Sequence, residues 1–192
     1  MTKEKKLIEI RWHGRGGQGT ITAANLLAKA AYKQGYKGVQ SIPWIGAERR
    51  GAPIKAFTRL SKEEIRIHSQ IYEPDVVIIM DHTIYSVYKG MVTAGLKSGS
   101  ILLMNAPKGF EVNSNPFKAC IVDATGISIN LGLEVAGNAV VNAPMLGAFA
   151  KATGILELET VEESIKEEWP GKWADKNVQA AINAYKAVNN SS

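Results

Sequence analysis

A cluster of glycines between an apolar stretch and a helical stretch constrains the fold of this chain most. Residues 12–23 read Trp-His-Gly-Arg-Gly-Gly-Gln-Gly-Thr-Ile-Thr-Ala. Glycine has no Cβ, so it tolerates positive φ angles and lets a ligand approach the main chain closely. A helix that begins after such a turn presents unpaired N–H groups and a partial positive charge. The sequence therefore predicts an anion site, most often a phosphate site, at a strand-to-helix turn.

The apolar pattern around this turn predicts the start of a nucleotide-binding fold. Residues 7–12 alternate as a strand does, and residues 18–34 carry apolar side chains at helical spacing up to the helix-ending Gly35. A second strand over residues 37–41 completes a βαβ unit with a right-handed crossover. We therefore expect a Rossmann-like, three-layer α/β fold with a mainly parallel sheet, an antiparallel hairpin and a helical C-terminus.

The rest of the chain alternates between further strands and helices. The expected antiparallel hairpin covers residues 54–60 and 64–68, and the expected central strands cover residues 75–80, 100–104 and 118–122. Helices are expected over residues 83–96, 138–151, 161–169 and 173–188. Residues 42–53 combine glycines, prolines, a tryptophan and two arginines, which favours an ordered, functional loop. We expect residues 1–192 to form a single α/β domain with a frayed tail at 189–192.

Composition narrows the class of protein. A chain of 192 residues with 45% apolar and 21% charged residues suits one globular core. Its longest wholly apolar run, residues 76–80, is far shorter than the ~20 residues that cross a bilayer, and no signal-peptide pattern follows the first six residues. We therefore expect a cytoplasmic protein with no membrane partner. The net charge of +5 is scattered along the chain, which argues against a nucleic-acid partner.

The chain has one cysteine, Cys120, in an apolar Ala-Cys-Ile-Val stretch. A single thiol cannot form an internal disulfide or supply the thiolates of an iron–sulfur cluster or a structural zinc site. We interpret it as a buried, inert thiol. The three histidines are too far apart in sequence to indicate a metal site. Any iron–sulfur cluster used with this chain is therefore expected on another chain.

Three of the glycines, Gly14, Gly16 and Gly19, fit the G-x-G-x-x-G pattern of dinucleotide sites. Such sites also need an acidic residue about 20 residues further on, where it binds the ribose hydroxyl. Here that stretch reads Val-Gln-Ser-Ile at residues 39–42 and holds no acid. The turn alone therefore leaves open NAD, FAD, another phosphate ligand, or a turn needed only for packing a helix on a strand.

Three polar residues beside the turn have two interpretations each. Arg15 suits bidentate contact with phosphate, although most loop arginines are only solvated. Gln18 can cap a backbone group, or it can bind a ligand or a partner. His13 lies at the mouth of the turn, where it can bind phosphate or be a hydrogen-bonded structural histidine.

Three further polar residues follow expected parallel strands: Asp81, Asn105 and Asp123. Open α/β sheets place their ligand crevice at this edge. Both aspartates also precede residues that can begin a helix, and aspartate is a preferred N-cap. For the aspartates we favour capping over catalysis.

The glycine turn and a later motif together carry a resemblance. Residues 14–19, followed by Ala23 and Ala24, and the Glu-Arg-Arg-Gly run at residues 48–51 resemble the gamma subunit, or equivalent domain, of the 2-oxoacid:ferredoxin oxidoreductases, with pyruvate synthase the most similar branch. The resemblance extends from about residue 8 through the helical C-terminus. One departure is Ala52, where the family commonly has a second glycine. The paired motifs are more specific than either glycine pattern alone.

The resemblance implies a subunit of a complex that oxidatively decarboxylates pyruvate to acetyl-CoA and reduces ferredoxin. It places thiamine diphosphate, Mg²⁺ and [4Fe–4S] clusters on the alpha, beta and delta subunits, and this chain has no Gly-Asp-Gly thiamine diphosphate signature and a single cysteine. Coenzyme A is the family cofactor left for this chain, because its phosphates suit backbone amides and arginines. No residue here is expected to be catalytic.

The resemblance thus assigns coenzyme A phosphates to the glycine turn. The expected binding residues are Gly14, Arg15, Gly16, Gly17, Gln18 and Gly19, together with Arg49 and Arg50. The last two arginines are expected to reach a phosphate or a partner chain. A competing interpretation makes both motifs a subunit-docking surface with Trp44 and the arginines as anchors. A stand-alone nucleotide-binding oxidoreductase and a gamma subunit for another 2-oxoacid are the remaining alternatives.

Overall fold

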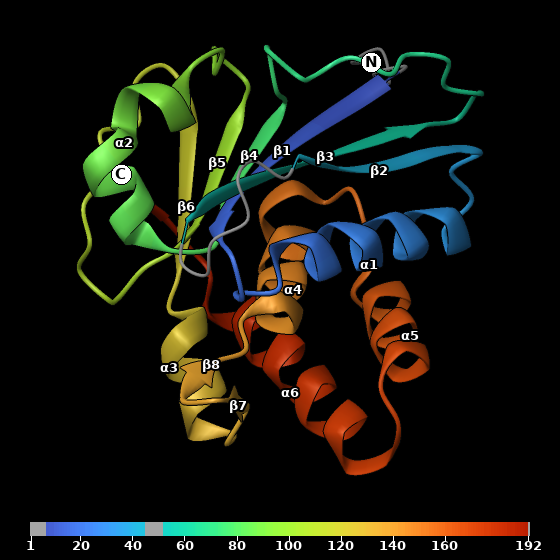
Figure 1. Ribbon diagram of the computed structural model, residues 1–192, viewed down its shortest axis with the longest axis vertical. Helices are drawn as coiled ribbons and strands as arrows, with labels where there is room; N and C mark the ends of the chain where they lie inside the picture. Colours follow the sequence, from blue (N-terminus) through green and yellow to red (C-terminus); the bar gives the residue numbers. More distant parts are fainter. Residues whose placement is uncertain (1–6, 45–51, 192) are drawn as a thin grey trace.

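The computed structural model describes residues 7–44 and 52–191, and these residues contain a seven-stranded sheet (Figure 1). Its strand order is β2-β3-β1-β4-β5-β6-β9. The strands are β1 (Leu7–Arg15), β2 (Gly38–Trp44), β3 (Pro53–Ser61), β4 (Val76–Ile79), β5 (Ile101–Asn105), β6 (Lys118–Val122) and β9 (Asn189–Ser191). The helices are α1 (Thr20–Lys33), α2 (His82–Thr93), α3 (Ala124–Asn130), α4 (Asn142–Thr153), α5 (Leu158–Glu168) and α6 (Gly171–Ala187). The expected Rossmann-like α/β class is confirmed.

Four neighbouring strands, β1, β4, β5 and β6, are parallel and form the centre of the sheet. Strand β4 is an unbroken run of valine and isoleucine, and each of its four residues is buried. Such a run suits a strand that is covered on both faces. The carboxyl ends of parallel strands meet at one edge of the sheet, so this edge also carries the polar residues that follow β4, β5 and β6.

The N-terminal part of the sheet differs from the expected adjacent βαβ unit. Strand β2 runs in the direction of β1, but β3 lies between them and is antiparallel to both. The hairpin is therefore β2–β3, and the prediction that residues 64–68 form the second hairpin strand is wrong. Both edges of β3 are already paired, so the segment after it has no strand to join. It crosses the sheet face instead, where Arg59 donates to the carbonyl of Ser69.

Helices cover both faces of the sheet in unequal numbers (Figure 1). Helices α1, α4, α5 and α6 pack on one face, and α2 lies on the other. Successive residues of β1 alternate between these layers: Ile10 and Trp12 join the larger core, whereas Arg11 and His13 face the opposite way. Within the larger layer, a Cβ at Gly147 would clash with the carbonyl oxygen of Ala181, so glycine allows α4 to lie close to α6.

Several short elements were not expected from the sequence. Helix α4 begins at Asn142 rather than at 138, and Pro144 marks its first turn. Before it, β7 (Glu134–Val135) and β8 (Asn138–Ala139) form a small hairpin. The C-terminal tail was expected to be frayed. In the structure, residues 189–191 instead form β9, which pairs with the edge of β6. Within the described part of the chain, no helix is both long enough and apolar enough to cross a membrane.

Candidate functional site at the glycine turn

The glycine turn joins β1 to α1, and its conformation depends on glycine. Gly14 and Arg15 are the last residues of β1, and Gly19 precedes the first residue of α1. Gly17 and Gly19 have φ angles of 93° and 73°, which L-residues with side chains rarely adopt. A Cβ on Gly14 would overlap the Oγ1 atom of Thr20. The tight strand-to-helix turn predicted from the sequence is therefore present.

Gln18 holds this turn together. Its Oε1 atom accepts a hydrogen bond from the backbone N–H of Arg15 at 2.8 Å, and its Nε2 donates to Asp81 Oδ2 at 2.9 Å. Of the alternatives open for Gln18, the structure shows the intramolecular one, since both ends of the amide bind groups of this chain. The side chain of Arg15 meets the same carboxylate, with 3.2 Å between Nε and Asp81 Oδ2. The turn is thus fixed to the start of α2.

Asp81 is both the partner of the turn and the N-cap of α2. Its Oδ1 accepts hydrogen bonds from the backbone N–H and the hydroxyl of Thr83, at 2.9 and 2.6 Å. Burial on its own would raise the pKa of Asp81, but hydrogen bonds from Thr83 and Gln18 and the charge of Arg15 outweigh it, so the pKa is lowered. The carboxylate therefore stays ionised at neutral pH and balances the charge of Arg15. The capping role expected for this aspartate is confirmed.

The other two polar residues at this edge also serve the fold. Asn105 donates from Nδ2 to the carbonyl of Met80 at 3.0 Å and to the hydroxyl of Thr125 at 2.9 Å. Asp123 accepts a hydrogen bond from the backbone N–H of Gly126 at 2.8 Å and caps α3, as expected. These contacts join the ends of β4, β5 and β6.

His13 lies behind the turn and is buried, with 2% of its surface exposed. Its Nε2 accepts a hydrogen bond from Nε of Arg11 at 3.1 Å. Burial, and then the positive charges of Arg11 and Lys55, lower the pKa of His13 to about 3. The ring is therefore neutral at physiological pH. Of its two interpretations, the structural histidine is the one that the structure supports.

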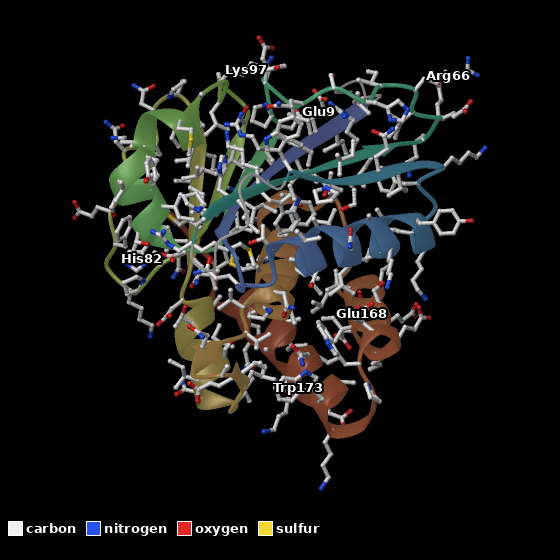
Figure 2. The ribbon with its side chains drawn as sticks, viewed as in Figure 1. Glu9, Arg66, His82, Lys97, Glu168 and Trp173 are labelled. Carbon is white, nitrogen blue, oxygen red and sulfur yellow. The ribbon has the colours of Figure 1, made fainter. Side chains whose placement is uncertain are left out.

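Two cavities meet at the glycine turn. The larger, about 570 Å³, lies between residues 15–19 and the β7–β8 hairpin. The smaller, about 220 Å³, is lined by polar residues at the carboxyl ends of the strands, including Asp81, His82 and Asn105. Gln18, Asn138 and Ala139 line both. His82 lies at the start of α2 (Figure 2), and its ring packs edge-on against Phe110.

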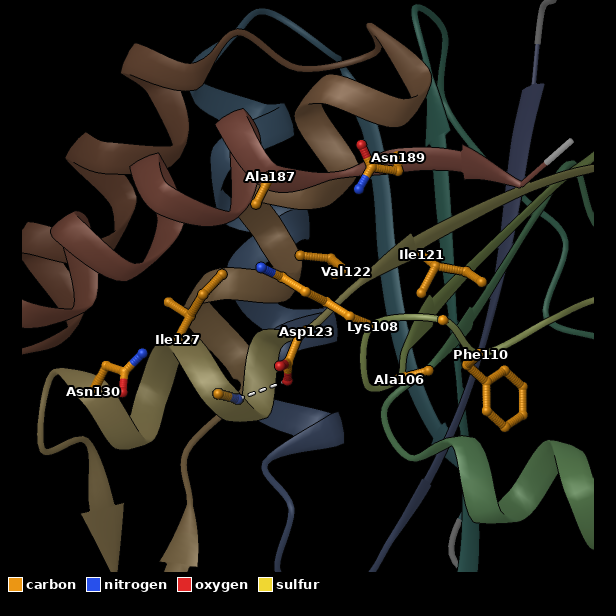
Figure 3. Close-up of a pocket in the computed structure, with 12 residues that line it drawn as sticks. Ala106, Lys108, Phe110, Ile121, Val122, Asp123, Ile127, Asn130, Ala187 and Asn189 are labelled. Atoms are coloured by element: carbon orange, nitrogen blue, oxygen red, sulfur yellow. Dashed lines mark hydrogen bonds between the residues drawn. The ribbon is translucent and has the colours of Figure 1, made fainter.

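A separate cavity of about 660 Å³ lies further along the same edge, between the carboxyl end of β6, α3 and the end of α6 (Figure 3). Its walls are mainly apolar and include Phe110, Ile121 and Ile127. Lys108 projects into it, and Asp123 points back to its own helix (Figure 3). Only Asp123 among the residues singled out from the sequence lines this cavity.

Some expected site residues cannot be placed beside the turn. Arg49 and Arg50 lie outside the described residues. Of the residues 42–53 that were expected to form a loop, the first three belong to β2 and Pro53 belongs to β3. Trp44 ends β2 with 49% of its surface exposed and meets Phe57 edge-on, with 6.4 Å between ring centroids. The β7–β8 hairpin was missed because its strands are too short to leave an alternating pattern.

Residues 9–187 match the family model described as pyruvate ferredoxin/flavodoxin oxidoreductase. The chain belongs to this family. The resemblance to 2-oxoacid:ferredoxin oxidoreductase subunits is therefore confirmed. Within the described residues, no cluster of three or more histidine, cysteine, aspartate or glutamate side chains has the geometry to hold a metal ion.

Relatives in the pyruvate ferredoxin/flavodoxin oxidoreductase family match along nearly their whole length. The chain is 50% identical to the pyruvate/ketoisovalerate oxidoreductases common subunit gamma of Thermococcus kodakarensis, covering 93% of this chain and 96% of the relative. It is 46% identical to pyruvate synthase subunit PorC of Methanothermobacter marburgensis, and the match covers 96% of this chain and 99% of that subunit. The crystal structure of pyruvate oxidoreductase subunit PORC from Thermotoga maritima superposes with a TM-score of 0.83 at 37% identity, covering 98% and 100%.

One larger chain is similar in fold at low sequence identity. The 2-oxoglutarate:ferredoxin oxidoreductase from Magnetococcus marinus, whose structure holds 2-oxoglutarate, coenzyme A and succinyl-CoA, matches with a TM-score of 0.75 and 22% identity. The match covers 95% of this chain but 32% of that larger chain. The same fold thus occurs as a separate chain and as part of a longer one.

Proposed function

We propose that this chain is the gamma subunit of a pyruvate:ferredoxin oxidoreductase, and that its glycine turn binds the phosphates of coenzyme A. Full-length identity of 46–50% to gamma and PorC subunits supports the first part. The complex converts pyruvate oxidatively to acetyl-CoA and reduces ferredoxin. A cytoplasmic location fits these reactants. Thiamine diphosphate, Mg²⁺ and the [4Fe–4S] clusters belong to the alpha, beta and delta partner subunits.

The observation that supports the coenzyme A site is the bare main chain of the turn. No atom lies within 4 Å of the position of a Cβ on Gly17, which lines the 570 Å³ cavity. Helix α1 begins three residues later, at Thr20, so the unpaired amides of its first turn and the positive end of the helix dipole adjoin this cavity. Asp81 already balances the charge of Arg15, and the N–H groups of Arg15, Gly16 and Gln18 already donate within this chain. The phosphate donors that we propose are therefore the amides at the start of α1.

Coenzyme A supplies the thiol that accepts the acyl group. The residues of this chain bind and orient its phosphate end, so that the thiol reaches the reacting centre on a partner subunit. Gln18 and Asp81 keep the turn in its binding conformation through their hydrogen bonds to each other and to Arg15. The contribution of this chain is thus positioning, which raises the effective concentration of the thiol.

The test is Gly17→Val in the coexpressed complex. The new side chain projects into the cavity and disfavours the positive φ angle, so coenzyme A should bind about tenfold more weakly by calorimetry. Gly99→Val is the matched control, since Gly99 has a φ of 87° and open space around its Cβ position but lines none of the three cavities described above. Equal coenzyme A affinity in both variants would disprove the phosphate site.

A second candidate role is subunit docking through Trp44. Tryptophan is enriched among residues that dominate interface energies, and this one is half exposed at the end of an outer strand. Trp44→Ala should weaken assembly by about 2 kcal/mol, measured as the complex concentration at which the subunit dissociates. Tyr32→Ala, at a 70% exposed aromatic on α1, is the control. Unchanged assembly of the Trp44 variant would remove the docking role.

A further inference from the structure

The β7–β8 hairpin forms the wall of the cavity that faces the glycine turn. Glu134 pairs with Ala139 and Val135 with Asn138, so two residues make the turn. These residues, Ala136 and Gly137, have φ angles of 50° and 76°. Positive φ at both central positions is the geometry of the tight type I′ hairpin turn. The wall is therefore a regular two-residue hairpin.

The base of the hairpin is fixed to α3. Leu133, just before it, is fully buried, and the carbonyl of Val140, just after it, accepts a hydrogen bond from the hydroxyl of Ser128 at 2.7 Å. The N–H of Val140 also donates to the carbonyl of Leu133 at 2.9 Å. At the tip, the amide of Asn138 donates to the carbonyl of Ala136 at 3.1 Å. These contacts join the hairpin to α3 and define the shape of its tip.

Ala136 is the one non-glycine residue with a positive φ in the described part of the chain. A left-handed conformation costs an L-residue such as alanine roughly 1–2 kcal/mol, and glycine or asparagine is usual at this turn position. Strain of this kind concentrates at functional sites, where the structure around it maintains it. What alanine adds over glycine is a methyl group on a residue that lines the cavity.

The two walls of the cavity differ in chemistry. The hairpin side presents one polar residue, Asn138, and four small apolar residues: Val135, Ala136, Ala139 and Val140. Val135 keeps 59% of its surface exposed. The opposite side is the glycine turn, residues 15–19, which leads into the positively polarised start of α1. A ligand that fits this cavity carries a phosphate, which faces the glycine turn. It also carries a flat apolar group, which packs against the hairpin.

We propose that the hairpin packs against the adenine ring of the nucleotide whose phosphates lie on the glycine turn. The inference rests on the proposed coenzyme A site. Adenine is flat, and its apolar faces suit valine and alanine side chains. The other end of coenzyme A, the pantetheine arm, must leave this chain to bring its thiol to the partner subunit. The nucleotide end is therefore the part that remains between the two walls.

The test is Val135→Ser in the coexpressed complex, with calorimetric titration of adenosine 3′,5′-bisphosphate, 4′-phosphopantetheine and coenzyme A. Loss of apolar contact should weaken the bisphosphate and coenzyme A about fivefold and leave 4′-phosphopantetheine unchanged. Val87→Ser is the matched control, because Val87 is 66% exposed on α2 and lines none of the three cavities described above. It should leave all three affinities unchanged.

Each other result overturns the proposal in a recognisable way. A loss confined to 4′-phosphopantetheine and coenzyme A would place the arm, not the base, on the hairpin. Unchanged affinities in Val135→Ser alongside weakened binding in Gly17→Val would remove the hairpin and keep the phosphate site. Full coenzyme A affinity in both variants would overturn the two proposals together.

Discussion

Two arginines on β1, Arg11 and Arg15, lie on the same face of the strand but act in different ways. Arg11 is 6% exposed and donates to four carbonyls and to His13. Arg15 is partly exposed beside a cavity and pairs with the carboxylate of Asp81. The side chain of Arg11 joins β1 to residues 71–72 and to the end of α2. The side chain of Arg15 joins the glycine turn to the start of α2.

The difference separates a stabilising role at Arg11 from the binding role that we propose for the other end of β1. The carbonyls around Arg11 belong to Ile71, Tyr72, Val92 and Ala94, so one guanidinium satisfies groups from two segments that pack on the sheet. Burial lowers the pKa of Arg11, and no carboxylate offsets this among its hydrogen-bond partners in the described structure. At the far end of β1 the polar groups instead shape a surface open to a ligand. We expect substitutions at the two ends to separate accordingly.

The largest expected effect is that of Arg11→Met. The variant keeps the buried aliphatic stem but leaves several carbonyls without a donor, and each such group costs about 1–3 kcal/mol. The free energy of unfolding should fall by about 3 kcal/mol in urea titrations. Arg66→Met is the control, because Arg66 (Figure 2) is 85% exposed and its ion-pair partner among the described residues, Glu64, is exposed as well. A loss for Arg11→Met as small as that of the control would contradict the joining role.

The second prediction concerns His13 and pH. Its pKa is about 3 in the folded chain and near 6.5 when unfolded, so the unfolded state takes up the proton first. The free energy of unfolding is unaffected by His13 above pH 6.5, where the ring is neutral in both states. It falls as the pH drops from 6.5 towards 3, because the unfolded state binds the proton more tightly. Between pH 6.5 and 5 this histidine should cost about 2 kcal/mol of the free energy of unfolding.

His13→Gln should remove that pH dependence, measured by urea titration at several pH values. His68→Gln, at an exposed histidine, is the control and should leave the slope unchanged. If the wild-type and His13→Gln proteins lose stability in parallel between pH 6.5 and 5, His13 does not titrate as its buried position requires.

Features that depend on a short stretch of sequence were predicted, whereas features that depend on distant segments were not. The glycine turn and strands such as β4 and β6 were predicted because their signals are local: residues that tolerate positive φ, or a short apolar run. The place of β3 between β1 and β2 depends on which strands pair, and no single segment records that choice. The hydrogen bonds of Arg11 likewise depend on two segments that lie more than 50 residues away.

The geometry of the candidate site could be predicted in part for the same reason. Gly17 and Gly19 must be glycine for their φ angles, so their role is visible in the sequence. The role of Gln18 is not visible in the sequence, because the acceptor of its amide hydrogen bond, Asp81, lies 63 residues later. The apolar wall of the cavity rests on two strands of two residues each, and such short strands leave no periodic pattern.

The smallest expected effect is that of Asp81→Asn, which sharpens the comparison at the other end of β1. Asparagine also caps helices, so α2 keeps its N-cap while Arg15 loses its ion pair. The free energy of unfolding should fall by about 1 kcal/mol at pH 7 in low salt, and by less in high salt, because the pair is partly exposed. Arg11→Met should show no such salt dependence.

The pH dependence of Asp81→Asn has a definite sign. The pKa of Asp81 is lowered in the folded chain, so its stabilising effect is present above the pKa of the unfolded carboxyl and disappears as the pH falls through the folded value. The variant and the wild type should therefore become equally stable in acid. Asp123→Asn is the control, since Asp123 caps α3 and has no ion pair within the described residues. A difference that persists in acid, or that appears equally in the control, would mean that capping rather than the ion pair with Arg15 accounts for the contribution of Asp81.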